Sequence, residues 1–121
     1  MISDISFVNL KKEVKMENTY PVVHHVLFWL KKPDSKADRD QLVAGIKTLK
    51  QIATVKEIHV GILAPTEERG VVDRSWGVSE LIFFDDLEGH NVYQTHPAHL
   101  VFIETYGHLW EKVIVYDAVE A

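Results

Sequence analysis

The sequence contains no cysteine among its 121 residues. Disulfide bonds and thiolate metal sites are therefore excluded, and nothing points to an oxidising compartment. Positive charge is also sparse: the formal net charge is −5, and adjacent basic residues occur only at 11–12 and 31–32. Because nucleic acids and anionic membranes attract concentrated basic surfaces, we expect neither as a partner.

Long apolar runs are missing as well. The most apolar stretch, at residues 20–30, is interrupted by His24 and His25 and is too short to span a bilayer. The first residues lack the basic start and continuous apolar core of a signal peptide, so we expect a cytoplasmic protein. The length fits one domain, and 46% apolar and 26% charged residues are ordinary for a globular protein.

What is present is a regular alternation of strand and helix patterns. Strands are indicated by β-branched and aromatic residues or by alternation, and helices by caps and apolar spacing. The first predicted elements are a strand at 20–30 and a helix from Asp34 or Ser35 to Gln51. Two strands follow, at 55–63 and 78–84, with a polar loop at 64–77 between them. A second helix is opened by Asp85 or Asp86, is interrupted by Pro97 and continues from 98 to about 109, and the last strand is predicted at 112–119. This β-α-β-β-α-β order predicts an α+β, ferredoxin-like domain.

Both faces of the predicted sheet are apolar. In the first strand, one face carries His24, Val26, Phe28 and Leu30, and the other carries Val23, His25, Leu27 and Trp29. Two helices can cover only one face of a four-stranded sheet, so something else must bury the second. A second copy of the chain is the simplest candidate, and we predict a homodimer packed sheet against sheet.

The segment Tyr93-Gln94-Thr95-His96-Pro97-Ala98-His99 places a phenol and two imidazoles around a helix-breaking proline. Together with Phe102 and the segment 109–117, it resembles the stress-responsive dimeric α/β-barrel (Dabb) family. The resemblance implies a dimeric α/β barrel, with residues 20–121 forming the Dabb domain and residues 1–19 an N-terminal extension. In that extension, we expect four apolar side chains to pack on the domain or its partner: Ile5, Phe7, Val8 and Leu10.

The resemblance also implies candidate site residues. In a plant polyketide cyclase of this family, which performs an aldol condensation without metal or cofactor, a histidine and a tyrosine of the motif act on the substrate. These positions match His99 and Tyr93 here, and the histidine of the first strand matches His24. The expected substrate-binding residues are Val26, Phe28, Leu30, Phe102 and Trp110.

The chemistry admits more than one role for these residues. His99 can act as a general base while Tyr93 hydrogen-bonds a developing enolate oxygen. The same two side chains can instead satisfy buried polar atoms and stabilise the helix break. The sequence therefore leaves open whether the protein is an enzyme or binder for a small apolar carbonyl compound, a cofactor-independent monooxygenase, or a non-catalytic, stress-related stable dimer.

Metal binding is not predicted, although the chain has seven histidines. His96 and His99 are three residues apart and His90 can approach His24, but no His-x-x-x-His or carboxylate–histidine pattern of standard form occurs. We expect neither a metal nor a cofactor. His96, which precedes Pro97, is expected to cap a helix or to pack in a loop rather than to take part in catalysis.

Overall fold

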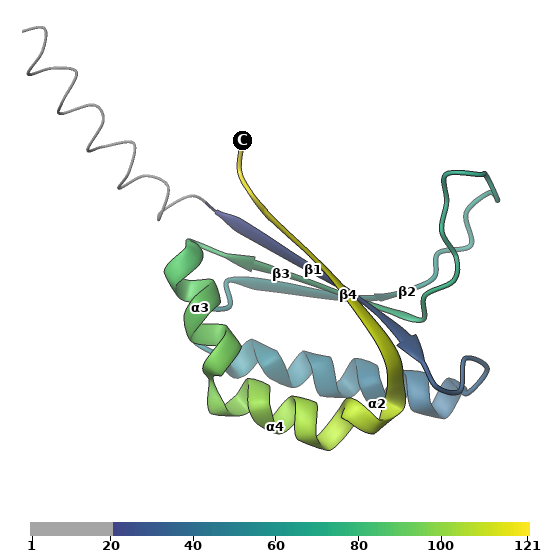
Figure 1. The fold of residues 1–121 in the computed structure, drawn as a ribbon, viewed down its shortest axis with the longest axis horizontal. Coiled ribbons are helices and arrows are strands. Elements are labelled where there is room, and N and C mark those ends of the chain that lie inside the picture. Colours follow the sequence, from purple (N-terminus) through teal and green to yellow (C-terminus); the bar gives the residue numbers. More distant parts are fainter. Residues whose placement is uncertain (1–20) are drawn as a thin grey trace, which may run out of the picture.

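The computed structural model describes residues 21–121, so the predicted packing of Ile5, Phe7, Val8 and Leu10 lies outside the described residues. The described chain folds into one sheet with helices on one side (Figure 1). Its elements are β1 (Val22–Leu30), α2 (Lys36–Lys47), a 3-10 turn (Thr48–Gln51), β2 (Glu57–Ile62), β3 (Val78–Phe84), α3 (Leu87–Thr95), α4 (Pro97–Tyr106), a second 3-10 turn (Gly107–Leu109) and β4 (Trp110–Val119).

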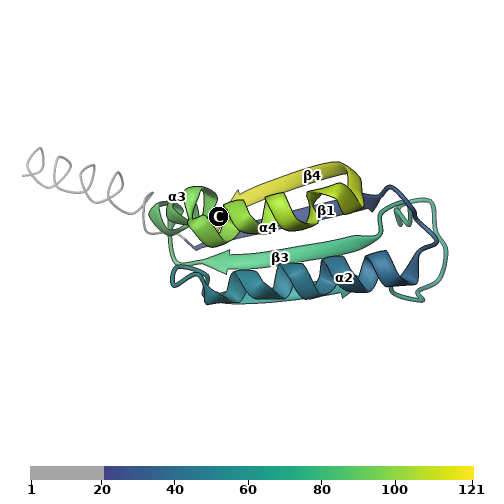
Figure 2. The same cartoon turned by 90° about the horizontal axis from the view of Figure 1, so that it is seen from below.

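The four strands form an antiparallel sheet in the order β2-β3-β1-β4. This arrangement confirms the predicted α+β, ferredoxin-like fold, with the second helix divided into α3 and α4. Figure 2 shows α2 and α4 running side by side along the sheet. Within the described part of the chain, no helix is long and apolar enough to cross a membrane.

Several predicted boundaries are corrected by the structure. The strand predicted at 55–63 runs only from Glu57 to Ile62, and the helix predicted to about residue 109 ends at Tyr106. The first helix ends at Lys47 rather than Gln51, because its last residues tighten into a 3-10 turn. The last strand begins at Trp110 rather than at residue 112. A register shift beside Leu30 lets that residue pair with Trp110, so the ladder between β1 and β4 extends further than the apolar pattern indicates.

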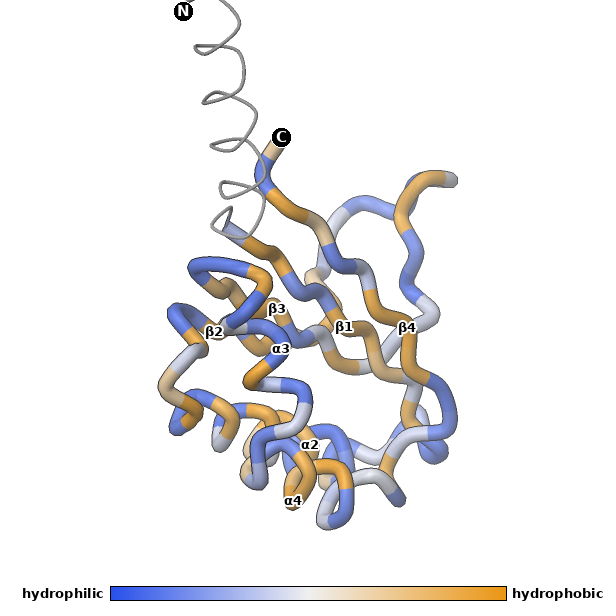
Figure 3. The backbone as a smooth tube through the Cα atoms, turned by 60° about the vertical axis from the view of Figure 1, so that its left-hand side comes forward, coloured by the Kyte–Doolittle hydropathy of each residue, from blue (hydrophilic) through white to orange (hydrophobic). Residues whose placement is uncertain are grey.

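The core lies between the helices and one face of the sheet. Along β1 and β3, buried and half-buried residues alternate without exception, which confirms the predicted division of the strand faces. The tube in Figure 3 shows hydrophobic segments gathered along the sheet and the facing helices. Gly45 of α2 permits close packing of α4, since a Cβ atom there would lie 2.6 Å from the Tyr106 ring.

The other face of the sheet carries half-buried or exposed apolar side chains from β1, β3 and β4. None of the described helices covers this face (Figure 1). Its apolar residues are Val23, Leu27, Trp29, Leu81, Phe83, Ile114 and Tyr116. Tyr116 on this face keeps 57% of its surface exposed.

Candidate functional site

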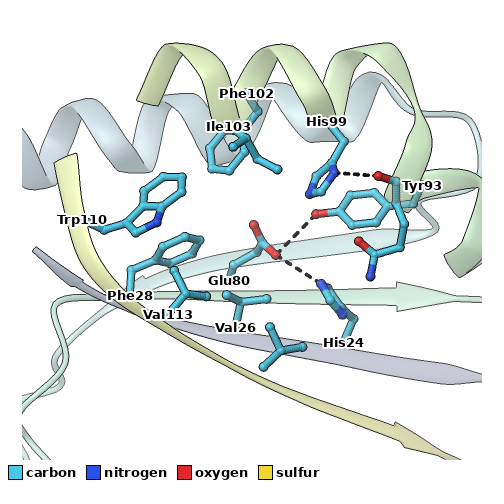
Figure 4. Close-up of a pocket in the computed structure, with 12 residues that line it drawn as sticks. His24, Val26, Phe28, Glu80, Tyr93, His99, Phe102, Ile103, Trp110 and Val113 are labelled. Atoms are coloured by element: carbon cyan, nitrogen blue, oxygen red, sulfur yellow. Dashed lines mark hydrogen bonds and ion pairs between the residues drawn. The ribbon is translucent and has the colours of Figure 1, made fainter. Parts of the chain in front are cut away.

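A cavity of about 250 Å³ lies between the sheet and α4 (Figure 4). Side chains of β1, β3, α3, α4 and β4 line it. The lining residues are His24, Val26, Phe28, Glu80, Tyr93, Gln94, His99, Phe102, Ile103, Trp110, Val113 and Val115.

The two ends of the cavity differ in chemistry. Phe28, Phe102 and Trp110 form an aromatic end, with ring centroids 4.9 Å apart for Phe28 and Trp110 and 5.7 Å apart for Phe102 and Trp110. The titratable groups gather at the opposite end, as Figure 4 shows. An apolar cavity with a few convergent polar groups is the usual form of a small-molecule site.

The break at Pro97 brings Tyr93 and His99 together. His96 has an extended backbone and its Nδ1 atom accepts from the Ala98 amide at 3.0 Å, which confirms its predicted capping role. The chain therefore starts a new helix at Pro97. As a result, the rings of Tyr93 and His99 lie 4.5 Å apart between centroids.

The hydrogen bond made by His99 defines its protonation pattern. Its Nδ1 atom lies 3.1 Å from the backbone oxygen of Gln94. Because a carbonyl oxygen only accepts, Nδ1 carries the proton and Nε2 keeps its lone pair. Burial lowers the pKa of His99, against a smaller opposing effect of the Gln94 carbonyl. A neutral imidazole of this kind can accept a proton.

Glu80 occupies the centre of the polar end and is only 2% exposed. Its Oε2 atom accepts from the Tyr93 hydroxyl at 3.5 Å and lies 3.7 Å from Nε2 of His24. Burial raises the pKa of Glu80 to about 8 against the lowering effect of the Tyr93 hydroxyl, so this side chain is largely neutral at pH 7. Burial, with the nearby Glu80, also raises the pKa of Tyr93, which keeps its hydroxyl protonated.

His24 lies between Glu80 and Asp117 of the edge strand β4. Its Nδ1 atom donates to Oδ1 of Asp117 at 2.5 Å, and the two residues lie opposite each other in the ladder between β1 and β4. Burial lowers the pKa of His24 more than the hydrogen bond to Asp117 raises it. The polar groups thus form a continuous series from Asp117 through His24 and Glu80 to Tyr93.

The structure places the sequence-predicted residues as follows. The three candidate catalytic residues line one cavity together with four of the five expected substrate-binding residues. Leu30 is the exception: it is buried at the other end of β1 and borders a different hollow, near Trp76. Leu30 shares the buried face of His24, Val26 and Phe28 but follows them along the strand, opposite Trp110 in the ladder.

Sequence reasoning missed Glu80 and Asp117. A signal was available for Glu80, since it alternates with Val78 and Ile82 on the buried face of its strand, where a carboxylate is out of place. Asp117 shares the face of Val113 and Val115, but its partner depends on strand register. The structure also brings one ligand atom each from His24, His90 and Asp117 within 4.8 Å of one another; the sequence allows the approach of His90 to His24 but does not indicate Asp117.

Comparison with known proteins gives a family and a fold. The family model described as the stress responsive A/B barrel domain, Dabb, matches residues 22–120. No curated protein matches the chain. A hydroxynitrile lyase from Passiflora edulis superimposes with a TM-score of 0.70 at 23% identity, covering 85% of this chain and 95% of that one.

Two further solved structures share the fold. A Dabb family protein with a ferredoxin-like fold from Mesorhizobium loti has a TM-score of 0.68 at 20% identity, covering 84% of this chain and 98% of that one. A dimeric protein of unknown function from Bacteroides fragilis has a TM-score of 0.64 at 23% identity, covering 83% and 96%. These identities establish the fold alone, whereas the family model spans nearly every described residue. The chain belongs to the Dabb family, the stress responsive A/B barrel domains.

Proposed function

We propose that the protein is a cofactor-free enzyme or binder for small, partly apolar carbonyl compounds, with His99 as the general base. One observation carries this proposal: a neutral His99, with Nδ1 held by the Gln94 carbonyl, lines an apolar cavity beside the Tyr93 ring. An imidazole whose lone pair is available in a largely apolar site suits proton abstraction next to a carbonyl group.

The chemistry follows the aldol pattern of a polyketide cyclase. Nε2 of His99 takes a proton from the carbon beside the carbonyl, and the electron pair of the broken C–H bond delocalises onto the carbonyl oxygen. Tyr93 turns its hydroxyl from Glu80, a contact already long at 3.5 Å, and donates to that oxygen. The carbanion then attacks a second carbonyl of the same molecule, and His99 returns the proton to the new alkoxide.

The remaining lining residues fit the same kind of ligand. An aromatic or flat unsaturated group can pack against Phe28, Phe102 and Trp110 while its carbonyl reaches the polar end. The protonation states of His24 and Glu80 then determine the net charge at the polar end of the cavity. The structural neighbour from Passiflora edulis is by name a lyase acting on hydroxynitriles, which is compatible with small-molecule chemistry on this fold.

The proposed assembly is a homodimer packed through the apolar outer face of the sheet. Support comes from the uncovered side chains of β1, β3 and β4 on that face, and from the Bacteroides fragilis neighbour, which is dimeric. The proposed domain spans residues 20–121, and residues 1–19 form an extension to it.

A non-catalytic role is the competing proposal, and one observation favours it. Tyr93 is only 1% exposed and its hydroxyl contacts Glu80, as expected for a side chain that stabilises the helix break. On this view His99 and Tyr93 hold α3 and α4 in place, and the protein acts as a stable dimer.

Proton exchange separates the two proposals without knowledge of the natural substrate. Phenylacetone and benzoylacetone carry exchangeable protons beside a carbonyl, and their uptake of deuterium from D₂O is followed by NMR. We expect the protein to accelerate exchange, His99→Ala to lose about 10²- to 10⁴-fold in rate, and Tyr93→Phe to lose less. His108→Ala, at an exposed histidine outside the cavity, is the matched control.

Two outcomes contradict the enzyme proposal. One is exchange by His99→Ala at the wild-type rate. The other is an absence of exchange with either probe, together with a large loss of thermal stability in both His99→Ala and Tyr93→Phe, which is the result that the non-catalytic role predicts.

A further inference from the structure

We infer that His24, His90 and Asp117 form a binding site for a divalent transition-metal ion of the Zn²⁺ class. This site does not depend on the proposed carbonyl chemistry, since His90 and Asp117 lie outside the cavity lining and only His24 is shared. The three residues come from β1, α3 and β4, three separate elements of the fold.

The donor set is chemically suitable. Two imidazole nitrogens and one carboxylate oxygen are ligands that Zn²⁺ and its neighbours in the first transition row bind readily. The three ligand atoms all lie within 4.8 Å of one another. Such a set leaves coordination positions open for water or another small ligand.

The distances are close to those of an assembled site. His24 Nδ1 and Asp117 Oδ1 are 2.5 Å apart, and His90 Nε2 lies 3.8 Å from the same oxygen. Metal–ligand bonds of about 2.0–2.2 Å place tetrahedral ligands roughly 3.3 Å apart. To bind an ion, the Asp117 oxygen must move away from His24 Nδ1 and the His90 nitrogen must move closer to that oxygen, which rotations of the Asp117 and His90 side chains can provide.

Glu80 adds a second and independent observation. Histidines that bind metals usually donate their other ring N–H to a carboxylate or carbonyl. In His24, the nitrogen that faces away from Asp117 is Nε2, and Oε2 of the almost fully buried Glu80 lies 3.7 Å from it. The fold thus places a buried carboxyl group beside His24, in the position of an outer-shell partner of a metal-bound histidine.

An ion can reach these three residues from solvent, and the hydrogen bond that His90 now makes can be broken. Asp117 keeps 44% of its side chain exposed, which gives an ion a route from solvent, whereas His24 is buried. The amide of Gln94 now donates to Nε2 of His90 at 3.3 Å. Gln94 is exposed, so it can turn away and leave that lone pair to the metal.

Co²⁺ titration of tag-free, chelator-treated protein tests the site directly, because its d–d absorption bands report tetrahedral or five-coordinate binding. We expect one Co²⁺ per chain, displaced by Zn²⁺. His90→Ala and Asp117→Asn should each weaken Co²⁺ binding by at least about 100-fold, which exceeds or equals the roughly 10- to 100-fold cost of losing an outer-shell partner. His59→Ala, at an exposed histidine on β2, is the matched control and should bind like the wild type.

Several outcomes would overturn this inference. They are an absence of absorption bands in the wild type, equal affinity in wild type, His90→Ala and Asp117→Asn, or an equal loss in His59→Ala. If His90→Ala does not fold, Asp117→Asn decides, since its side chain is partly exposed and the change is isosteric. His99→Ala should keep full Co²⁺ affinity, so failure of the carbonyl chemistry and failure of the metal site are distinguishable.

Discussion

The rings of Tyr93 and His99 lie 4.5 Å apart between centroids, although the two residues belong to different helices. In one straight helix, residues at this spacing would lie on different faces. The interruption at Pro97 turns α4 relative to α3 and directs both rings to the same cavity. The position of the candidate base therefore depends on a backbone feature as much as on the base itself.

The pH dependence of proton exchange should report the pKa of His99. Burial lowers that pKa below 6.5, and only the neutral imidazole can accept a proton. We therefore expect exchange to decline as the pH falls, with a midpoint below 6.5. Rates measured from pH 4.5 to 8 give the midpoint, and a midpoint above 7 would contradict the assignment of His99 as the base.

Glu80→Gln should change how stability depends on pH. Because burial raises the pKa of Glu80 from 4.5 to about 8, the folded state binds more protons than the unfolded state between these values. The free energy of unfolding of the wild type should then fall as pH rises through this window, by up to about 1.4 kcal/mol per pH unit from this group. Stability from this group is fully present below pH 4.5 and lost above pH 8.

Glu80→Gln should abolish this group's contribution to the decrease of the free energy of unfolding with pH. Gln keeps the shape and cannot ionise, so Glu80→Gln should be more stable than the wild type at pH 8.5 and similar to it at pH 5. Urea unfolding with a chelator present measures both. Equal slopes in the two proteins would show that Glu80 is ionised in the folded state. Glu104→Gln, at an exposed carboxylate on α4, is the control.

Leu27→Asp should prevent dimer formation. Leu27 lies on the uncovered face of the sheet, opposite Ile114 in the β1–β4 ladder. A charge without a partner in a sheet-to-sheet interface should cost several kcal/mol, roughly three or more. Sedimentation velocity at micromolar concentration should show a wild-type dimer and a monomeric or aggregated variant.

Leu100→Asp is the matched control for this change. Leu100 is 54% exposed on α4, on the opposite side of the sheet from the expected interface. The variant should remain dimeric. A stable, folded wild-type monomer, or dissociation by Leu100→Asp alone, would argue against packing through the outer face of the sheet.

Gly45→Ala should destabilise the protein although alanine favours helices. The new Cβ atom would lie 2.6–2.8 Å from Cδ2, Cε2 and Cγ of Tyr106, and a ring approached at its base cannot simply turn aside. Overpacking of this kind costs about 1–3 kcal/mol, against a gain in helix propensity of about 1 kcal/mol. Gly107→Ala is the control, since its nearest neighbour is Trp110 Cζ2 at 3.8 Å. Thermal unfolding should show a lower Tm only for Gly45→Ala.

The sequence alone determined the elements, the strand faces and the helix break. Alternation in residues 22–30 and 78–84 reports local backbone geometry, in which successive side chains point to opposite faces. Proline likewise acts locally, so Pro97 and the capping role of His96 are readable without tertiary contacts. The motif from Tyr93 to His99 led to the family for the same reason, because its residues are neighbours in the chain.

Only the tertiary structure decided which groups complete the polar end of the cavity. His24 and Asp117 are distant in sequence and meet because β1 pairs with β4 in one particular register. Glu80 reaches Tyr93 and His24 only after β3 takes its place beside β1. A shift of one residue would turn each of these side chains to the other face, so register, a property of paired strands rather than of either strand alone, decides the site.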